Sequence, residues 1–154
     1  MRILICCAMG LSLSACATYE PPVDSGVAKT EVINKSYDAT WQRATEWFAN
    51  NNVPIKNIVK DSGLIATDYR LGADSSFIDC GKVGTYEAFG DKNVTVNFIA
   101  KEKSTNATDV RLNVFGTGRV TQSDLYGNST GSGRTIDCLS TGKLETKLFT
   151  YLAE

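Results

Sequence analysis

The sequence predicts an α+β domain: an antiparallel sheet of about five strands with two helices packed on one face. Apolar and polar residues alternate over 94–101 and 110–115, the pattern of half-buried strands. Apolar residues recur at helical spacing over 41–48 and again over 144–152. The predicted order of elements is β-α-β-β-(β)-β-β-α, which segregates the helices from the sheet.

The first predicted strand and the first predicted helix lie close together in the chain. Glu31 to Lys35 is short and β-prone, with Val32 and Ile33. Asp38 then occupies the position of an N-cap, and we expect a helix from about Ala39 to Asn50, where three asparagines and a proline end the pattern. Its buried stripe is expected to contain Trp41, Trp47 and Phe48.

A β-hairpin and a long loop are predicted next. Ile55 to Lys60 and Leu64 to Arg70 are apolar-rich, and the connection between them ends in Gly63, where a positive φ is usual. We expect a loop over residues 71–83, containing Cys80, and an optional strand over 86–89. The alternating strands 94–101 and 110–115 join at residues 104–107.

The end of the chain predicts a loop followed by a helix. Gln122 to Arg134 is polar and glycine-rich, as surface loops are. Ser140 or Thr141 is then expected to cap a final helix. One face of that helix holds the apolar residues Leu144, Leu148, Tyr151 and Leu152. Another face holds Lys143 and Lys147.

Residues 1–15 have the layout of a secretory signal peptide. Arg2 supplies the positive end, a run of apolar and small residues follows to Leu11, and small residues close the segment. That run is shorter than the ~20 residues that a membrane-spanning helix needs. The alternative is that Arg2 to Cys6 forms a buried first strand. The proline-containing, aperiodic segment after Cys16 argues against that alternative.

Leu13-Ser14-Ala15-Cys16 resembles the lipobox of bacterial lipoproteins at all four positions. The resemblance implies cleavage after Ala15, acylation of Cys16 and a stable membrane anchor. Ala17 in place of aspartate implies sorting to the outer membrane. Residues 16–29 are then a lipidated N-terminus and a flexible tether of about 40 Å at full extension, and 30–154 form one periplasmic domain.

Composition excludes several classes of function. The chain of 154 residues is 42% hydrophobic and carries 16 basic and 17 acidic residues, so it lacks the basic excess that nucleic-acid binding requires. It contains no histidine, which removes the commonest general base and most zinc sites. We therefore expect no catalytic residues, no cofactor, no metal and no nucleic-acid partner.

The pattern around the first helix and the hairpin resembles a known family. Tyr37 to Ala44, Asn52 to Ile55 and Lys60 to Thr67 are similar to the opening of helix-grip domains in envelope lipoproteins of the BamC type. The resemblance covers about 35 residues and the order of elements. It implies a helix-grip-like fold and an envelope protein as partner. The chain departs from that family in having one such domain and a cysteine pair.

The cysteines predict one disulfide. Cleavage removes Cys6 and Cys7, lipidation uses Cys16, and Cys80 and Cys138 remain in an oxidising compartment. A redox catalyst would usually present a Cys-x-x-Cys spacing, which these residues lack. A zinc site would need further ligands, for which Asp79 and Asp137 are the candidates. We expect a structural bridge that pins the 71–83 loop against the start of the last helix.

Three functions from different classes follow. The leading one is a non-enzymatic outer-membrane lipoprotein that acts as an accessory or scaffold subunit through protein–protein interaction. The alternative is a binding module for a lipid or another apolar molecule, held in a cavity between sheet and helix. The third is an acyl-transfer enzyme built on Ser140 and Lys143, which match a Ser-x-x-Lys spacing. The companion motifs of such enzymes are missing, so helix capping is the expected role of that segment.

Overall fold

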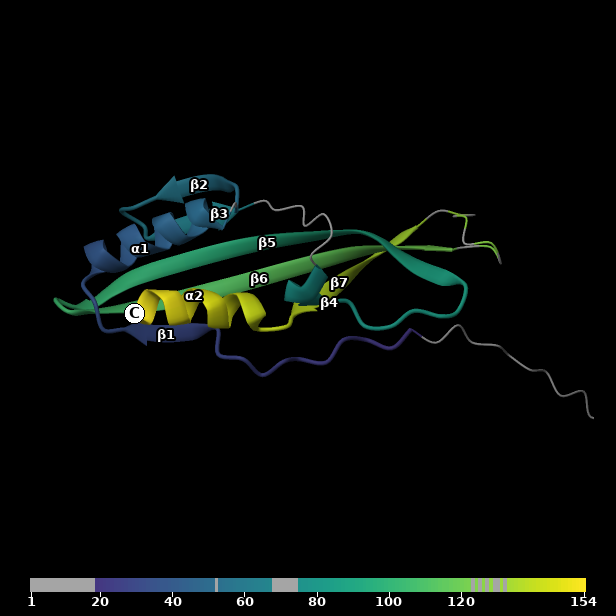
Figure 1. Ribbon diagram of the computed structural model, residues 1–154, viewed down its shortest axis with the longest axis horizontal. Helices are drawn as coiled ribbons and strands as arrows, with labels where there is room; N and C mark the ends of the chain where they lie inside the picture. Colours follow the sequence, from purple (N-terminus) through teal and green to yellow (C-terminus); the bar gives the residue numbers. More distant parts are fainter. Residues whose placement is uncertain are drawn as a thin grey trace, which may run out of the picture.

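The computed structural model in Figure 1 describes residues 19–51, 53–67, 75–122, 124, 126, 128, 131 and 133–154. Within them the chain is an α+β protein with a seven-stranded antiparallel sheet and two α-helices. The elements in chain order are β1 (Thr30–Ile33), α1 (Tyr37–Asn50), β2 (Ile55–Val59), β3 (Leu64–Thr67), the 3-10 turn η1 (Ser75–Phe77), β4 (Ile78–Asp79), β5 (Glu87–Ser104), β6 (Ala107–Gln122), β7 (Arg134–Ser140) and α2 (Lys143–Ala153).

The sheet is built around one long hairpin, formed by β5 and β6. The strands follow the order β2-β3-β5-β6-β7-β4, and β1 also pairs with β6. β5 pairs with β6 along almost its whole length. β1 and β7 therefore share the second edge of β6: β1 pairs with residues 108–111 and β7 with residues 116–120. One end of β6 thus carries the beginning of the domain and the other end carries its last strand.

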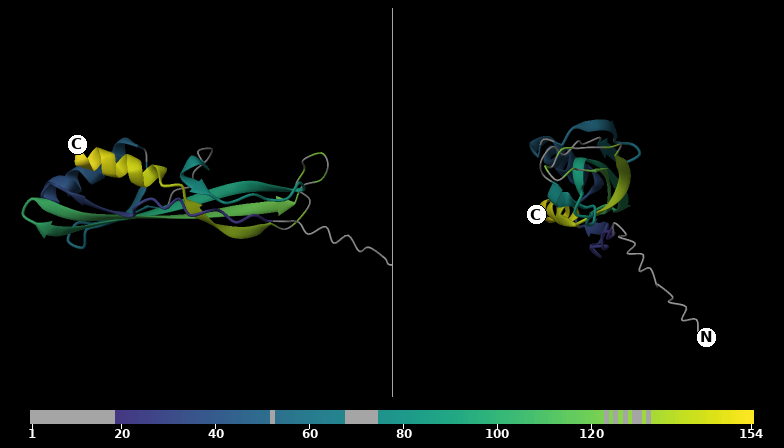
Figure 2. Two further views of the ribbon diagram at one scale, coloured as in Figure 1. Left: turned by 90° about the horizontal axis from the view of Figure 1, so that it is seen from below. Right: turned by 90° about the vertical axis from the view of Figure 1, so that its right-hand side faces the viewer.

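Side-chain alternation gives the sheet two different faces. Val94, Val96, Phe98 and Ala100 of β5 are buried on the face that carries the helices. The intervening side chains point to the opposite face, which we call the outer face. Figure 2 shows both helices above the same side of the sheet, toward the end where β5 turns into β6. The expectation that the helices lie on one face is confirmed.

The core forms where the helices cross the hairpin. Trp41, Trp47 and Phe48 of α1 are buried, as the sequence predicted. The Phe48 and Phe98 rings meet edge to face, with centroids 6.1 Å apart. Leu144, Leu148 and Leu152 of α2 are also buried, so the apolar stripe of each helix faces the sheet. Buried aromatic side chains such as these contribute a large share of the apolar surface that stabilises a core.

The predicted hairpin is present, and its turn requires glycine. β2 and β3 pair antiparallel, with Val59 opposite Leu64. Gly63 has φ of 67°, and a Cβ there would lie 1.9 Å from the Ala100 carbonyl oxygen. The turn therefore packs directly on β5. Residues 68–70, predicted to continue the second strand, lie outside the described residues.

Both predicted helix caps are wrong. Helix α1 begins at Tyr37, and its cap is Ser36, whose Oγ accepts a 3.4 Å hydrogen bond from the Ala39 amide. Asp38 lies one residue further into the helix, and its carboxylate pairs with Lys60 at 2.8 Å. The cap of α2 is Gly142, in the left-handed region with φ of 79° and without a side-chain bond. Of the two hydroxyls that were expected to cap it, that of Ser140 bonds to Glu145 of the same helix and that of Thr141 to the Ser76 carbonyl.

The predicted strand count and order also need correction. The segment over 86–89 is the beginning of β5, not a separate strand. β4 lies inside the predicted 71–83 loop, and β7 was not predicted. β4 has two residues and exists through its pairing with β7, so no local periodicity could reveal it. β7 has a weak apolar pattern because only Ile136, Cys138 and Leu139 are apolar.

Candidate functional site: the disulfide and the N-terminal strap

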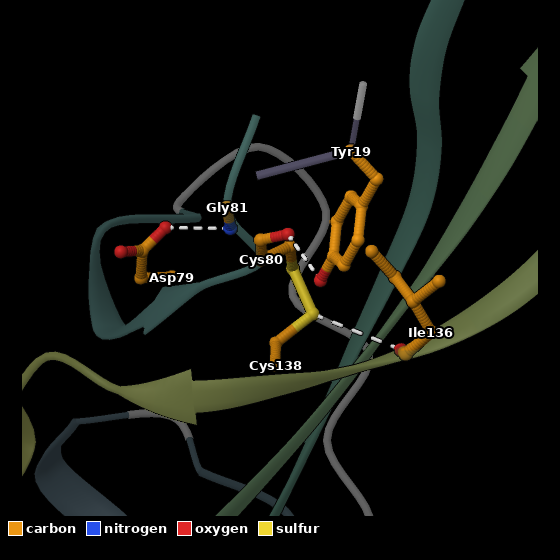
Figure 3. Close-up of a disulfide and its surroundings, with 6 residues drawn as sticks. All are labelled: Tyr19, Asp79, Cys80, Gly81, Ile136 and Cys138. Carbon is orange, nitrogen blue, oxygen red and sulfur yellow. Dashed lines mark hydrogen bonds between the residues drawn. A yellow bond between two sulfur atoms is a disulfide. The ribbon is translucent and has the colours of Figure 1, made fainter. Parts of the chain in front are cut away.

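A disulfide joins Cys80 and Cys138 where β4 ends beside β7 (Figure 3). The two strands pair antiparallel through Asp79 and Leu139, which places the cysteines opposite each other. Their Cα atoms are 4.2 Å apart, close to the short distance of a non-hydrogen-bonded pair in an antiparallel ladder. The structure therefore joins the two cysteines that were predicted to form a disulfide, which lie 58 positions apart in the chain. Cys16, the predicted lipidation site, lies outside the described residues.

Two glycines of β6 make room for this disulfide. A Cβ at Gly118 would lie 3.1 Å from the Cys80 sulfur and 3.3 Å from the Cys138 sulfur. A Cβ at Gly116 would lie 2.8 Å from the Ile78 side chain. Sequence reasoning missed this role, although glycines at alternate positions of a strand signal a close approach on one face.

Residues 19–29, which we call the N-terminal strap, begin against the disulfide. The Tyr19 hydroxyl donates a 3.2 Å hydrogen bond to the Cys80 carbonyl, as Figure 3 shows. The backbones of Glu20 and Lys82 exchange hydrogen bonds of 3.0 and 2.9 Å, and their side chains form a 3.0 Å ion pair. Gly81 lies between these partners, and a Cβ there would be 2.1 Å from the Glu20 carbonyl oxygen. The chain thus forms a small two-stranded contact at the disulfide.

The strap contacts the domain twice more before β1 begins. The Val27 side chain packs so closely on Gly142 that a Cβ there would lie 2.2 Å from Val27 Cγ2. The Lys29 carbonyl accepts a 2.9 Å hydrogen bond from the Leu112 amide of β6. Residues 19–29 belong to the segment expected to be a flexible tether. The described part of that segment contacts the domain at its beginning and near its end.

The Ser-x-x-Lys segment does not bring its serine and lysine together as a reactive pair. The Ser140 hydroxyl donates a 2.8 Å hydrogen bond to the carboxylate of Glu145 and accepts one from the Gly142 amide. The Thr141 hydroxyl donates to the Ser76 carbonyl at 2.7 Å. Lys143 is exposed on the first turn of α2. The segment therefore joins β7 and η1 to the start of the last helix.

Glu145 is a buried carboxylate that sequence reasoning missed. Its side chain is only 1% exposed, and Ser140 is its hydrogen-bond partner. Its burial could have been expected from its position beside Leu144 and Leu148, on a helix whose apolar face is wide. A buried carboxylate requires such a partner because burial without hydrogen bonds is costly.

A second polar contact lies at the end of the hairpin, farther along the sheet. Arg134 of β7 donates to both carboxylate oxygens of Glu87 at the start of β5. This bond holds the pKa of the Glu87 carboxyl below its ordinary value and raises that of Arg134, and the Gly84 amide contributes to the shift of Glu87. The contact ties the beginning of β5 to β7 across β6.

A groove of about 630 Å³ crosses the outer face near β1. Four of its lining residues are charged, namely Glu31, Lys101, Asp109 and Arg111. In the described part of the chain, no group of three or more cysteine, aspartate or glutamate side chains is gathered as metal binding would require. Asp79 therefore has no such cluster around it, and its carboxylate accepts a hydrogen bond from the Gly81 amide.

The fold and the site define an α+β domain in which one disulfide anchors both a loop and the N-terminal strap. Comparison with protein-family models and with curated proteins finds no match. Of the helices that the structure describes, none has the length and apolar character to cross a membrane.

Proposed function

We propose that this protein is a non-enzymatic outer-membrane lipoprotein whose helix-grip-like periplasmic domain acts as an accessory or scaffold subunit for another envelope protein. The observation that carries the proposal is the sequence Leu13-Ser14-Ala15-Cys16 at the end of a signal-peptide pattern. The disulfide agrees with export, because disulfides persist in oxidising compartments such as the periplasm.

The state of the reactive groups favours a binding role over catalysis. Ser140, the one nucleophile that a motif suggested, is nearly buried and bonded to Glu145. Lys143 occupies an exposed position of α2. The cysteines are paired with each other. The polar contacts that the structure describes therefore serve to join segments of the fold.

The outer face supports interaction with another protein. Phe115 of β6 is 54% exposed and Leu139 of β7 is 39% exposed. They adjoin the Gly116–Cys138 pair and point away from the helices, so both lie on the outer face. Val32 and Val59 are exposed on the same face. Exposed apolar side chains gathered on one face are typical of protein-binding surfaces.

The alternative, a module for an apolar ligand, has less support. Side chains of α1, α2 and β5 pack against one another in the helix–sheet interface, where Phe48, Phe98, Leu148 and Leu152 are all fully buried. Half of the residues that line the groove on the outer face are charged. Native mass spectrometry of the mature protein checks this alternative, because a co-purified apolar molecule would favour it over the scaffold role.

Lipidation is tested by Cys16→Ser. The wild-type protein is expected to incorporate labelled palmitate and to fractionate with outer membranes. The variant is expected to remain an unlabelled precursor of higher mass. A Cys80→Ser/Cys138→Ser variant is the matched control, because it removes two cysteines and leaves the lipobox intact. Mature, membrane-bound protein from the Cys16→Ser variant would contradict the proposal.

Partner binding is tested with a photo-crosslinking aromatic residue in living cells. Placed at Phe115, it is expected to give one reproducible adduct with an envelope protein. The control position is Tyr86, an exposed aromatic residue at the far end of β5. If Phe115, Leu139 and Val59 all give no protein adduct, the scaffold role is wrong.

A further inference from the structure

We infer that the strap holds the domain upright on the lipid surface, with one end of the sheet against the phospholipid headgroups. This end, which we call the tip, comprises the paired ends of β5 and β6 at Glu87 and Gln122, with Tyr86 and Arg134 next to Glu87 and with Tyr126 four residues after Gln122 in the chain. The inference rests on the proposed lipidation of Cys16 and adds to it a fixed orientation and a lipid-facing surface.

Chain length makes the anchor short. Only Ala17 and Thr18 separate Cys16 from Tyr19, which is bonded to Cys80. Three Cα–Cα steps of ~3.8 Å span at most roughly 11 Å, whatever conformation the two residues adopt. A strap free from residue 17 to residue 29 would reach about 40 Å. The contacts of Tyr19 and Glu20 therefore replace a long tether with a short one.

The beginning of the strap lies toward the tip. Tyr19 is bonded to Cys80, and Glu20 pairs with Lys82, five residues before β5 begins at Glu87. Figures 1 and 2 show the strap running from β1, beside the helices, toward the opposite end of the sheet. From Gly116, beside the disulfide, to Gln122 is six residues, or about 20 Å of strand. A lipid anchor within roughly 11 Å of Tyr19 spans about half of this distance, so the tip can reach the headgroups when the sheet stands upright on the membrane.

The side chains at the tip suit a headgroup region. Tyr86 is 60% exposed and Tyr126 is 89% exposed. The Asp124 carboxylate accepts hydrogen bonds from the Tyr126 and Asn128 amides. Tyrosine is enriched at membrane–water interfaces because its ring is amphipathic. The charges of Glu87 and Arg134 neutralise each other beside these rings.

The opposite end of the sheet then points away from the membrane. The β5–β6 turn pairs Ser104 with Ala107, fifteen residues along β6 from Gln122. At ~3.3 Å per residue, this turn stands about 50 Å from the tip. Exposed charged residues flank the turn, among them Lys101, Glu102, Lys103 and Asp109. Such residues suit water and a protein partner better than lipid.

The test measures how close each end is to lipid. Thr85 and Thr105 are exposed threonines near the tip and at the far turn. Each is replaced by cysteine in the full-length lipidated protein, labelled with a fluorophore and reconstituted into phosphatidylethanolamine–phosphatidylglycerol vesicles with nitroxide on the headgroups. We expect loss of most emission for the Thr85→Cys label and no measurable loss for the Thr105→Cys label. Quenching at both positions means that the domain lies flat, and quenching at neither means that it is freely tethered; either result overturns the inference.

A second set of variants tests the strap itself. Tyr19→Phe with Lys82→Glu removes the hydroxyl donor and places a negative charge opposite Glu20. We expect the quenching at Thr85 to fall toward that at Thr105. Tyr19→Phe with Lys101→Glu makes the same charge change near the far turn, away from the strap, and is expected to retain most of the quenching at Thr85. Unchanged quenching in the first variant overturns the strap as the cause. Labelled palmitate is measured on each sample, so a failure of lipidation is distinguished from a failure of orientation.

Discussion

Gly118 of β6 lies directly against the Cys80 sulfur, so close that a Cβ at residue 118 would be 3.1 Å from it. The disulfide therefore lies flat on the sheet, over two positions without side chains. This placement brings the Cys80 carbonyl within reach of the Tyr19 hydroxyl. A glycine in the middle of the chain thus helps to position the N-terminal strap.

A side chain at residue 118 is expected to destabilise the protein. Gly118→Val adds a Cβ and two methyl groups directly against the two sulfurs, and overpacking of this kind costs about 1–3 kcal/mol. Gly90→Val is the control, because the nearest atom to a Cβ there is the Arg119 carbonyl oxygen at 3.6 Å. Urea unfolding of the two variants measures the difference. Equal stability would mean that the close contact at Gly118 has no energetic consequence.

Removal of the disulfide is expected to lower the free energy of unfolding by about 4 kcal/mol in the chain-entropy model for a loop of this length. The variant is Cys80→Ser/Cys138→Ser, compared with wild type in urea. Reduced wild-type protein should show a similar loss, which controls for the serine hydroxyls. The strap should also become more accessible to protease near Val23. A loss below ~1 kcal/mol would contradict the structural role.

The pair formed by Ser140 and Glu145 is expected to act as a unit. Ser140→Ala leaves the buried Glu145 carboxylate without that donor, at a cost of about 1–3 kcal/mol. In a double-mutant cycle with Glu145→Ala, the double variant should lose less free energy of unfolding than the two single variants lose together, because the residues are in contact. Ser104→Ala, at the exposed β5–β6 turn, serves as the control. Additive losses would show that the bond contributes nothing.

Acid should weaken the protein partly through Glu87. Because Arg134 holds the folded-state pKa of Glu87 below its ordinary value of 4.5, the carboxylate contributes stability above that pH. The contribution is lost as pH falls through the lowered pKa. Wild-type stability is therefore expected to decline more steeply below pH 4.5 than that of Glu87→Gln. Arg134 is half exposed, so salt should reduce the difference.

Unfolding at a series of pH values measures this slope. Glu102→Gln removes an exposed carboxylate far from Arg134 and is the matched control. It is expected to keep the wild-type slope. If the free energy of unfolding depends on pH in the same way in wild type and in Glu87→Gln, this ion pair does not stabilise the fold.

Local patterns predicted the elements that carry their own signal. The stripe of α1 with Trp41 and Phe48 and the turn at Gly63 are as expected, because helical spacing and a required positive φ are properties of short segments. The two helix-cap predictions were wrong because partners elsewhere in the fold bind some of the polar residues expected to cap. Thr141 donates to the Ser76 carbonyl, and Asp38 pairs with Lys60 from inside the helix.

The sequence by itself predicted the α+β class, the buried stripes of both helices and the pairing of Cys80 with Cys138, and it contains the lipobox-like segment on which the proposed function rests. Only the tertiary structure decided that β4 exists, that Gly116 and Gly118 lie under the disulfide, and that the strap is docked. The physical reason is distance along the chain. Tyr19 and Cys80 are 61 residues apart, and no local periodicity can report a contact that exists only after the sheet has brought its partners together.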